Sequence, residues 1–230
     1  MEHASPHSRR RSLPAALALA AVLATGAAVA LAPSPAPAQG GGAPGLSAQD
    51  RRTVEQVEDY LEGLDTLEAR FVQIASGSRL EQGTVWLDRP GRMRIEYDDL
   101  PHLIVADGFW LTFWDGELEQ RSDVPLSEHP AGLLVREDVE LSGDVRVDDV
   151  AYGPASTRVT LVRAQDPGAG SLTLVFEGRA DEGDAIALDR WVFLDAQGKT
   201  VEVDLLDARP GADVADVRFA APRPPADRRD

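Results

Sequence analysis

The sequence contains no cysteine among its 230 residues. Without thiols the chain forms no disulfide bonds, so an exported form must be stabilised by packing alone. The same absence excludes thiolate metal ligands. It also removes the residue through which a bacterial lipoprotein is attached to lipid. The chain is therefore not expected to carry a covalent lipid anchor.

Histidine is nearly as scarce. Beyond residue 38 there are only His102 and His129, each beside a proline, and neither has another histidine at metal-ligand spacing. The sequence also has no G-x-S-x-G elbow, no phosphate-binding loop and no dinucleotide-binding glycine pattern. These absences argue against an enzyme and predict no cofactor and no metal. They leave open a glycosidase-type carboxylate pair among the many acids.

Basic residues are outnumbered, with 23 Lys and Arg against 39 Asp and Glu, which gives a net charge of −16. Such a charge excludes nucleic acid and anionic membrane surfaces as electrostatic partners. The clustered acids lack the spacing of a calcium-binding EF-hand loop, and we expect them in solvated loops. These clusters are Asp98-Asp99, Asp148-Asp149, and Asp181 with Glu182 and Asp184.

The N-terminus has the three parts of a secretory signal peptide. Three arginines at residues 9–11 precede an Ala/Leu/Val run over residues 13–31, and Ala36-Pro37-Ala38 offers a cleavage site. We expect residues 1–38 to be removed and the protein to be exported. A single membrane anchor is the alternative, because the apolar run nearly reaches spanning length. The choice between the Sec and twin-arginine routes stays open.

The rest of the chain is predicted to form a flexible lead-in at 39–46, a single domain at 47–222 and a charged, Pro-rich tail at 223–230. Ser47 and Asp50 form a capping-box signature, and apolar residues at helical spacing follow up to about Gly63. From Leu67 the period changes to two, which predicts a strand with Leu67, Ala69, Phe71 and Gln73 on one face.

Strands dominate after this point, separated by short turns typical of antiparallel hairpins. Residues 124–136 interrupt the pattern with prolines, a glycine and leucines, which predicts a short helix or lid-like loop, and residues 141–147 are ambiguous. One helix followed by many strands indicates a mainly β fold, a curved antiparallel sheet or unclosed barrel covered by helical pieces. The expected strands are 80–88, 91–97, 101–106, 109–114, 117–121, 157–164, 171–177, 185–194, 199–206 and 217–220.

The run FWLTFW at 109–114 is apolar on both faces of its strand, so both faces are expected to be covered. A sheet with one wet face would expose half of these side chains. This block contains almost nothing that could perform covalent chemistry. It is typical of a protein that holds an apolar ligand against a β-surface.

A series of short motifs runs from residue 71 to residue 222. In chain order they are Phe71-x-Gln73, Gly83-x-x-Trp86-x-x-Arg89-Pro90, Glu96-Tyr97, Ile104-Val105-x-Asp107-Gly108, Glu119-Gln120, Pro130 with Leu133-Leu134, and Arg218-Phe219-x-x-Pro222. With this order and the signal peptide, the chain resembles the outer-membrane lipoprotein carrier family (LolA) over about residues 50–222.

The resemblance implies an unclosed barrel with a helical lid over a hydrophobic cavity. It implies a periplasmic carrier, expected to be a monomer, that takes acylated lipoproteins from an inner-membrane ABC transporter. The cargo then passes to an outer-membrane acceptor, either a protein or the membrane itself. Which lipoproteins are carried is not indicated.

The resemblance also assigns candidate site residues. Arg89 falls on the position that latches the lid, and Leu133 and Leu134 fall on the lid. The small pair Ala131-Gly132 departs from the bulkier family pattern and raises a question about how the lid packs. The face of the strands that points inward stays open. The candidate cavity residues are Phe71, Val85, Leu87, Phe109, Leu111 and Phe113, or the opposite alternation.

Two relatives of this family provide alternatives. A lipid- or lipoprotein-sensing periplasmic protein such as RseB shares the fold but carries a second domain, for which this sequence has no residues left. The anchored acceptor LolB needs a lipidated N-terminal cysteine, which is absent here. The carrier is the leading hypothesis, and the sensing protein is the alternative.

Overall fold

The computed structural model describes residues 45–76, 80–214 and 219–222. The expected signal peptide at 1–38, most of the lead-in at 39–46 and the tail at 223–230 lie outside the described residues. Among the described residues, no helix combines the length and the apolar character needed to cross a bilayer.

The described residues form an 11-stranded antiparallel sheet in the order β6-β5-β4-β3-β2-β1-β11-β10-β9-β8-β7. Because β6 and β7 at its two ends do not pair with each other, the sheet is curved but unclosed, as predicted. The strands of the first half are β1 (Thr66–Ala75), β2 (Leu80–Asp88), β3 (Arg92–Tyr97), β4 (His102–Asp107), β5 (Trp110–Asp115) and β6 (Gln120–Pro125). Those of the second half are β7 (Val145–Tyr152), β8 (Ser156–Arg163), β9 (Gly170–Glu177), β10 (Ala187–Asp195) and β11 (Thr200–Pro210).

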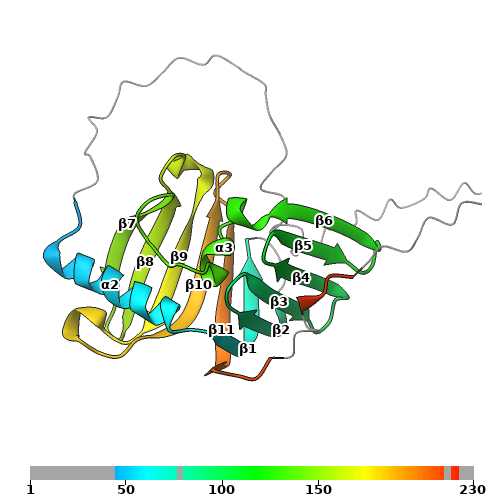
Figure 1. Ribbon diagram of the computed structural model, residues 1–230, viewed down its shortest axis with the longest axis horizontal. Coiled ribbons are helices and arrows are strands. Elements are labelled where there is room, and N and C mark those ends of the chain that lie inside the picture. The colour runs from blue at the N-terminus through cyan, green and yellow to red at the C-terminus, as the bar shows by residue number, and fades with distance from the viewer. Residues whose placement is uncertain (1–44, 77–79, 215–218, 223–230) are drawn as a thin grey trace, which may run out of the picture.

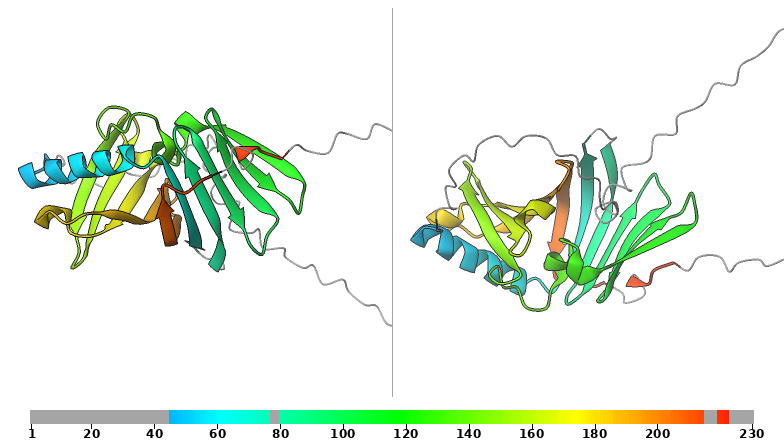
Figure 2. Two further views of the ribbon diagram at one scale, coloured as in Figure 1. Left: turned by 60° about the horizontal axis from the view of Figure 1, so that its bottom comes forward. Right: turned by 90° about the horizontal axis from the view of Figure 1, so that it is seen from above.

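The two halves of the sheet meet where β1 pairs with β11, and they turn their concave sides toward each other (Figures 1 and 2). The connection between β6 and β7 crosses this space. It contains the 3-10 helix η2 (Leu126–Glu128) and the four-residue helix α3 (Gly132–Val135). Two further 3-10 helices, η3 (Pro167–Ala169) and η4 (Ala180–Glu182), lie in hairpin connections of the second half.

Helix α2 (Ala48–Glu62) begins at the predicted capping box. The Ser47 hydroxyl accepts from the Asp50 amide, and the Asp50 carboxylate accepts from the Ser47 amide, both at 3.0 Å. The helix lies across the second half of the sheet (Figure 1). The Tyr60 ring meets Phe176 of β9 edge to face, with ring centroids 5.5 Å apart, and its hydroxyl accepts from the Leu188 amide of β10.

The alternation predicted for β1 is confirmed. Leu67, Ala69, Phe71 and Gln73 are buried, whereas Ile74 on the other face is 46% exposed. The buried polar Gln73 is satisfied, because its carbonyl oxygen accepts from the Tyr97 hydroxyl at 2.9 Å and its amide donates to Glu81 at 3.1 Å. Burial raises the pKa of the Tyr97 hydroxyl above its ordinary value.

Several boundaries differ from the prediction. The ambiguous residues 141–147 lead into β7, an edge strand that also contains Asp148 and Asp149, which were expected in a loop. Both side chains are exposed, and the pairing of β7 shifts register between Val147 and Asp149. Of the brief strand expected at 217–220, residues 217–218 lie outside the described residues, and Phe219 and Ala220 are not in a strand.

The expectation that both faces of FWLTFW are covered is met only in part, because Thr112 on the outer face is buried whereas Phe109 and Trp110 are exposed. Leu111 and Phe113 are buried inside, but Trp110 on the outer face is 47% exposed. Nearer the centre of this half, outward-facing Trp86 and Val105 are buried. The segment 219–222 lies against this side: Arg92 stacks over the Phe219 ring at 5.3 Å, and Arg94 donates to the Ala220 carbonyl.

Close packing around Gly83 of β2 yields a stability prediction. Gly83 pairs with Phe71 on one side and Tyr97 on the other, and an added Cβ would lie 1.9 Å from the Glu96 carbonyl oxygen. We expect Gly83→Ala to lower the free energy of unfolding by about 1–3 kcal/mol in urea denaturation, because the neighbouring backbone must move. Gly45→Ala, which meets no atom within 4 Å, is the control. An unchanged urea midpoint for Gly83→Ala would contradict this packing.

Candidate functional site

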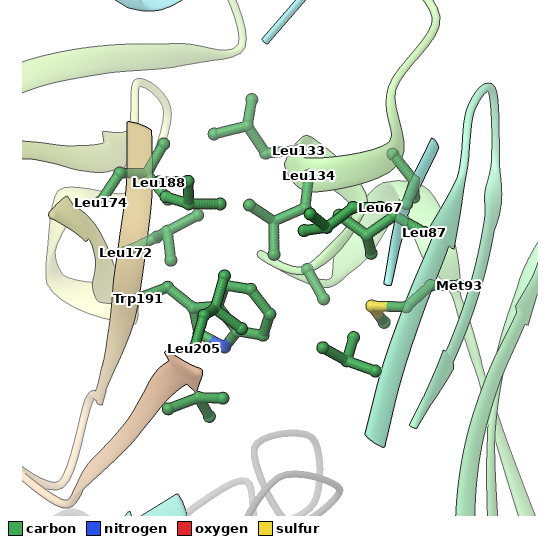
Figure 3. Close-up of a cluster of buried hydrophobic side chains, with 14 of the residues drawn as sticks. Leu67, Leu87, Met93, Leu133, Leu134, Leu172, Leu174, Leu188, Trp191 and Leu205 are labelled. Carbon is green, nitrogen blue, oxygen red and sulfur yellow. The ribbon is translucent and has the colours of Figure 1, made fainter. Parts of the chain in front are cut away.

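Residues 126–137, here called the lid segment, fill the space between the two halves of the sheet. Leu133 and Leu134 are buried in the same cluster as the sheet interior. Figure 3 shows both leucines between two apolar walls. The wall from β1–β3 includes Leu67, Leu87 and Met93, and that from β9–β11 includes Leu172, Leu174, Leu188, Trp191 and Leu205.

The beginning of the lid segment is held by two hydrogen bonds from its backbone amides. The Leu126 amide donates to the Phe109 carbonyl at 2.9 Å, and the Ala131 amide donates to Nδ1 of His129 at 3.1 Å. An added Cβ on Gly132 would lie 2.3 Å from the Leu126 carbonyl oxygen. The small residues at 131–132 therefore let α3 pack closely on η2, which answers the question raised by their departure from the family pattern.

The end of the lid segment is bound by the turn between β2 and β3. The last carbonyls of a helix have no partner within it and need donors from elsewhere. The Gly91 amide donates to the Val135 carbonyl at 2.6 Å, and Nε of Arg89 donates to the Arg136 carbonyl at 3.1 Å. Nη2 of Arg89 also donates to the carbonyls of Arg136 and Glu137.

Arg89 thus lies in the turn that directly follows β2, and its side-chain hydrogen bonds go to the lid backbone. It is half-buried, and this burial lowers the pKa of its guanidinium, while the charges of Glu62 and Asp65 act in the opposite direction. The guanidinium is a fork of several donors, which suits adjacent carbonyl acceptors. Gly91 beside it has a φ of +82°, and an added Cβ would lie 2.8 Å from Cα of Gly108.

A pocket of about 260 Å³ lies between the lid segment and the second half of the sheet. Its apolar wall is a row of paired residues across four strands: Leu161 of β8, Leu172 of β9, Phe193 of β10 and Val201 of β11. Leu133 of the lid segment faces this row across the pocket. The wall therefore offers a continuous apolar surface to a chain-like ligand.

The mouth of the pocket is charged. Arg136 donates to both carboxylate oxygens of Asp144 at 2.8 Å, and these bonds lower the pKa of Asp144 below its ordinary value. Asp195 accepts from the amides of Gln197 and Lys199 at 2.9 and 2.8 Å. Both carboxylates thus accept hydrogen bonds, Asp144 from a cation and Asp195 from neutral amides.

The structure brings five of the six candidate cavity residues together on one face. Phe71, Val85, Leu87, Leu111 and Phe113 are all buried in the cluster that also holds the lid leucines. This decides which alternation points inward. None of the five lines the pocket, whereas Leu133 of the lid does.

Phe109 is not where the candidate set placed it. It lies in the turn before β5 and is 82% exposed. The Asp107 carboxylate accepts from the amides of Phe109 and Trp110 at 3.0 and 2.9 Å, and Gly108 has a φ of +101°. Because of this side-chain-capped turn, β5 begins at Trp110, one residue later than the apolar run suggested.

Sequence reasoning did not assign the residues of the pocket wall or Gly91. The strands that carry Leu161, Leu172 and Phe193 were predicted, and their alternation was a usable signal. For Gly91, the Pro-Gly turn was visible, but its hydrogen bond to Val135 joins residues too distant in sequence to be predicted.

The described residues offer little for catalysis. No group of three or more His, Asp or Glu among them could hold a metal ion. His102, expected in a loop, begins β4 and is buried, with Nδ1 3.6 Å from Oδ1 of Asp115. Neither residue lines the pocket. The arrangement around the lid segment is suited to burying an apolar chain.

Comparison with known proteins agrees with this geometry. A family model described as "Outer membrane lipoprotein carrier protein LolA" matches residues 62–222, more than half of the chain. An outer-membrane lipoprotein carrier protein of Pseudomonas entomophila is 37% identical over 107 residues, covering 42% of this chain and 48% of that protein. One of Pseudomonas fluorescens is 38% identical over 112 residues, covering 44% and 50%. The chain spans about half the length of the curated relatives it matches.

Solved structures with a similar fold were also found. A LolA superfamily protein from Nitrosomonas europaea has 12% identity and a TM-score of 0.42, covering 73% of this chain and 97% of that one. An uncharacterized conserved protein from Thermus thermophilus has 15% identity and a TM-score of 0.44, covering 76% and 95%.

The close contact at Gly132 leads to a prediction about the lid segment. Gly132→Ala should displace α3 from η2, because its Cβ would lie 2.3 Å from a backbone oxygen. Amide hydrogen exchange should then become faster at Gly91 and Leu134, whose amides are protected by the closed lid. Gly168→Ala in η3, where an added Cβ would lie 3.7 Å from Oδ1 of Asp166, should leave these rates unchanged. Equal rates in both variants would show that α3 tolerates the added methyl group.

Proposed function

This chain belongs to the outer-membrane lipoprotein carrier family LolA, and we propose that it carries lipoproteins by holding their acyl chains in its hydrophobic interior. In this proposal the protein works in the periplasm, as a monomer. It receives acylated lipoproteins from an inner-membrane ABC transporter and delivers them to an outer-membrane acceptor, either a protein or the membrane. No catalytic role is proposed.

The position of the lid leucines is the observation that carries this proposal. Leu133 and Leu134 lie between two apolar walls that belong to opposite halves of an unclosed sheet. If the lid segment moved away, an acyl chain could take the place of these side chains without exposing either wall to water. The pocket beside Leu133 adjoins this space, because Leu172 belongs both to the pocket lining and to the wall from β9–β11.

Energetics explain why such a carrier needs a lid. Burying an acyl chain yields ~0.8 kcal/mol per methylene, so a chain of about sixteen carbons gains on the order of 12 kcal/mol. Cargo bound with all of this free energy would be released too slowly for transport. A stable closed state competes with the cargo, because closing the lid buries the two leucines again and recovers part of the free energy.

We propose that Arg89 is the latch of this closed state. It lies at the end of β2 and donates to the carbonyls of Arg136 and Glu137, directly after α3. Hydrogen bonds from a charged donor contribute roughly 1.5–3 kcal/mol each. Together with the Gly91 amide, Arg89 would set how strongly the closed lid opposes cargo binding.

The proposal includes the processing of the chain. Residues 1–38 would be removed as a signal peptide and residues 47–222 would form the single carrier domain. The intact mass of the protein isolated from the periplasm tests this point. A mass that retains residues 1–38 would favour a membrane-anchored protein.

The carrier function is tested directly by its cargo. Protein isolated from the periplasm should contain co-purifying acylated polypeptides by mass spectrometry, and an apolar fluorescent probe bound to the emptied protein should be displaced by acylated lipoprotein. Loaded protein should then release its cargo to acceptor membranes. Binding without transfer would favour the sensing alternative, and absence of both would reject the proposal.

The latch leads to a separate prediction. Arg89→Leu should fold and accept lipoprotein but release it more slowly, because the empty closed state loses roughly 1.5–3 kcal/mol per hydrogen bond relative to the loaded state. Arg89→Lys should lie between, since it keeps the charge but loses the planar fork. The measurement is transfer from pre-loaded protein to acceptor membranes.

Arg70→Leu is the matched control for the latch. Arg70 also lies in the first half of the sheet, but its side chain binds Asp98 and Thr84 rather than the lid segment. The Arg70→Leu variant should release lipoprotein at the same rate as the unmodified protein. Normal release by Arg89→Leu would reduce Arg89 to a structural turn residue.

A further inference from the structure

We propose that the pocket beside the lid segment binds a single alkyl chain that ends in an anionic group, a carboxylate or a phosphate. The alkyl chain would lie on the apolar row that includes Leu161 and Phe193, and the anionic group would lie at the mouth, near Arg163 and Lys199. This ligand class is distinct from the proposed lipoprotein cargo, and the inference does not depend on lipoprotein transport.

The wall of the pocket consists of two rows of residues that run across strands β8 to β11, one apolar and one charged. The apolar row pairs directly from β8 to β11. Two residues farther toward the strand ends, the same face carries Arg163, Gly170, Asp195 and Lys199, all of which line the pocket. Because side chains two residues apart share a face of a strand, a ligand on the apolar row meets this charged row next.

The two cations of the charged row are available. The two carboxylates of the pocket lining accept hydrogen bonds from other groups: Asp144 from Arg136, and Asp195 from backbone amides. Among the described residues, Arg163 and Lys199 form no ion pair and donate no side-chain hydrogen bond, whereas most described arginines are ion-paired. In a chain with a net charge of −16, this pocket is lined by three cationic side chains, Arg136, Arg163 and Lys199, against two carboxylates, Asp144 and Asp195, and this local excess of positive charge favours an anionic ligand.

The chemistry of the two side chains fits carboxylate and phosphate oxygens. A guanidinium binds either group through two parallel hydrogen bonds, and an ammonium adds a compact point charge. Gly170 lies beside Arg163 in this row and contributes no side chain; an added Cβ there would lie 2.2 Å from the Leu194 carbonyl oxygen, so the packing of β9 on β10 requires glycine at this position.

The size of the pocket limits the ligand to one chain. Its volume of about 260 Å³ lies below the roughly 300–1,000 Å³ of pockets that hold drug-sized ligands. One narrow chain segment fits beside the closed lid segment, whereas several acyl chains would require the lid to move. The pocket can therefore be occupied while Arg89 still binds the lid backbone.

The experiment compares three ligands of equal chain length by calorimetry: decanoate, decyl phosphate and decanol. Both anions should bind at least about tenfold more tightly than the alcohol, a difference that corresponds to ~1.4 kcal/mol. Added salt should weaken the binding of the anions and not that of the alcohol. Acetate and inorganic phosphate, which lack the chain, should bind much more weakly than either anionic lipid. The relative affinities of decanoate and decyl phosphate distinguish a fatty acid from a phospholipid-type ligand.

The variants assign the effect to the pocket. Arg163→Gln with Lys199→Gln should weaken both anions about tenfold and leave decanol unchanged. Arg158→Gln is the matched control, since Arg158 is exposed on the same strand but does not line the pocket. Equal binding of anions and alcohol, or an unaffected double variant, would overturn the inference. Lipoprotein transfer by the double variant should be normal, so failure here is distinguishable from failure of the carrier proposal.

Discussion

Burial of Leu133 and Leu134 between the two halves of the sheet is the interaction on which the rest of the structure depends. An unclosed sheet of eleven strands has a concave apolar face that nothing in its own hydrogen bonding can cover. A four-residue helix has almost no stability of its own, because helix formation has a costly nucleus. The lid segment is therefore helical because it is packed, and the apolar side chains of the sheet interior are buried with the lid leucines in one cluster.

Polar contacts at both ends of the lid segment make this packing specific. Apolar burial is non-directional, and leucines could fill the same space in several registers. The Leu126 amide bound to Phe109 fixes one end, and Arg89 with Gly91 fixes the other. The turn between β2 and β3 thus decides where α3 stops, although it is more than forty residues away in the sequence. The turn therefore fixes the position of the lid segment as well as stabilising it.

Much of the fold could be predicted from local pattern. The capping box of α2 and the alternation of β1 depend on neighbouring residues, and both are confirmed. The face of β2 and β5 that points inward could not be chosen from alternation alone, because both faces of these strands are rich in apolar residues. Phe109 was misplaced because Asp107 caps a turn where the apolar run appeared continuous. The pocket was missed since it requires four strands and the lid segment to come together.

Pairing of β1 with β11 has a consequence for how the molecule is assembled. The strands β2 to β6 form a meander of local hairpins, but Phe71 of β1 pairs with Leu205 of β11. Contacts between residues so distant in sequence form slowly, because a long loop must close first. A chain that has not yet received its last long strand would expose the edge of β1 together with the apolar face behind it. Such an edge is a template for aggregation. Pairing of β11 with β1 therefore protects the folded sheet from self-association at this edge.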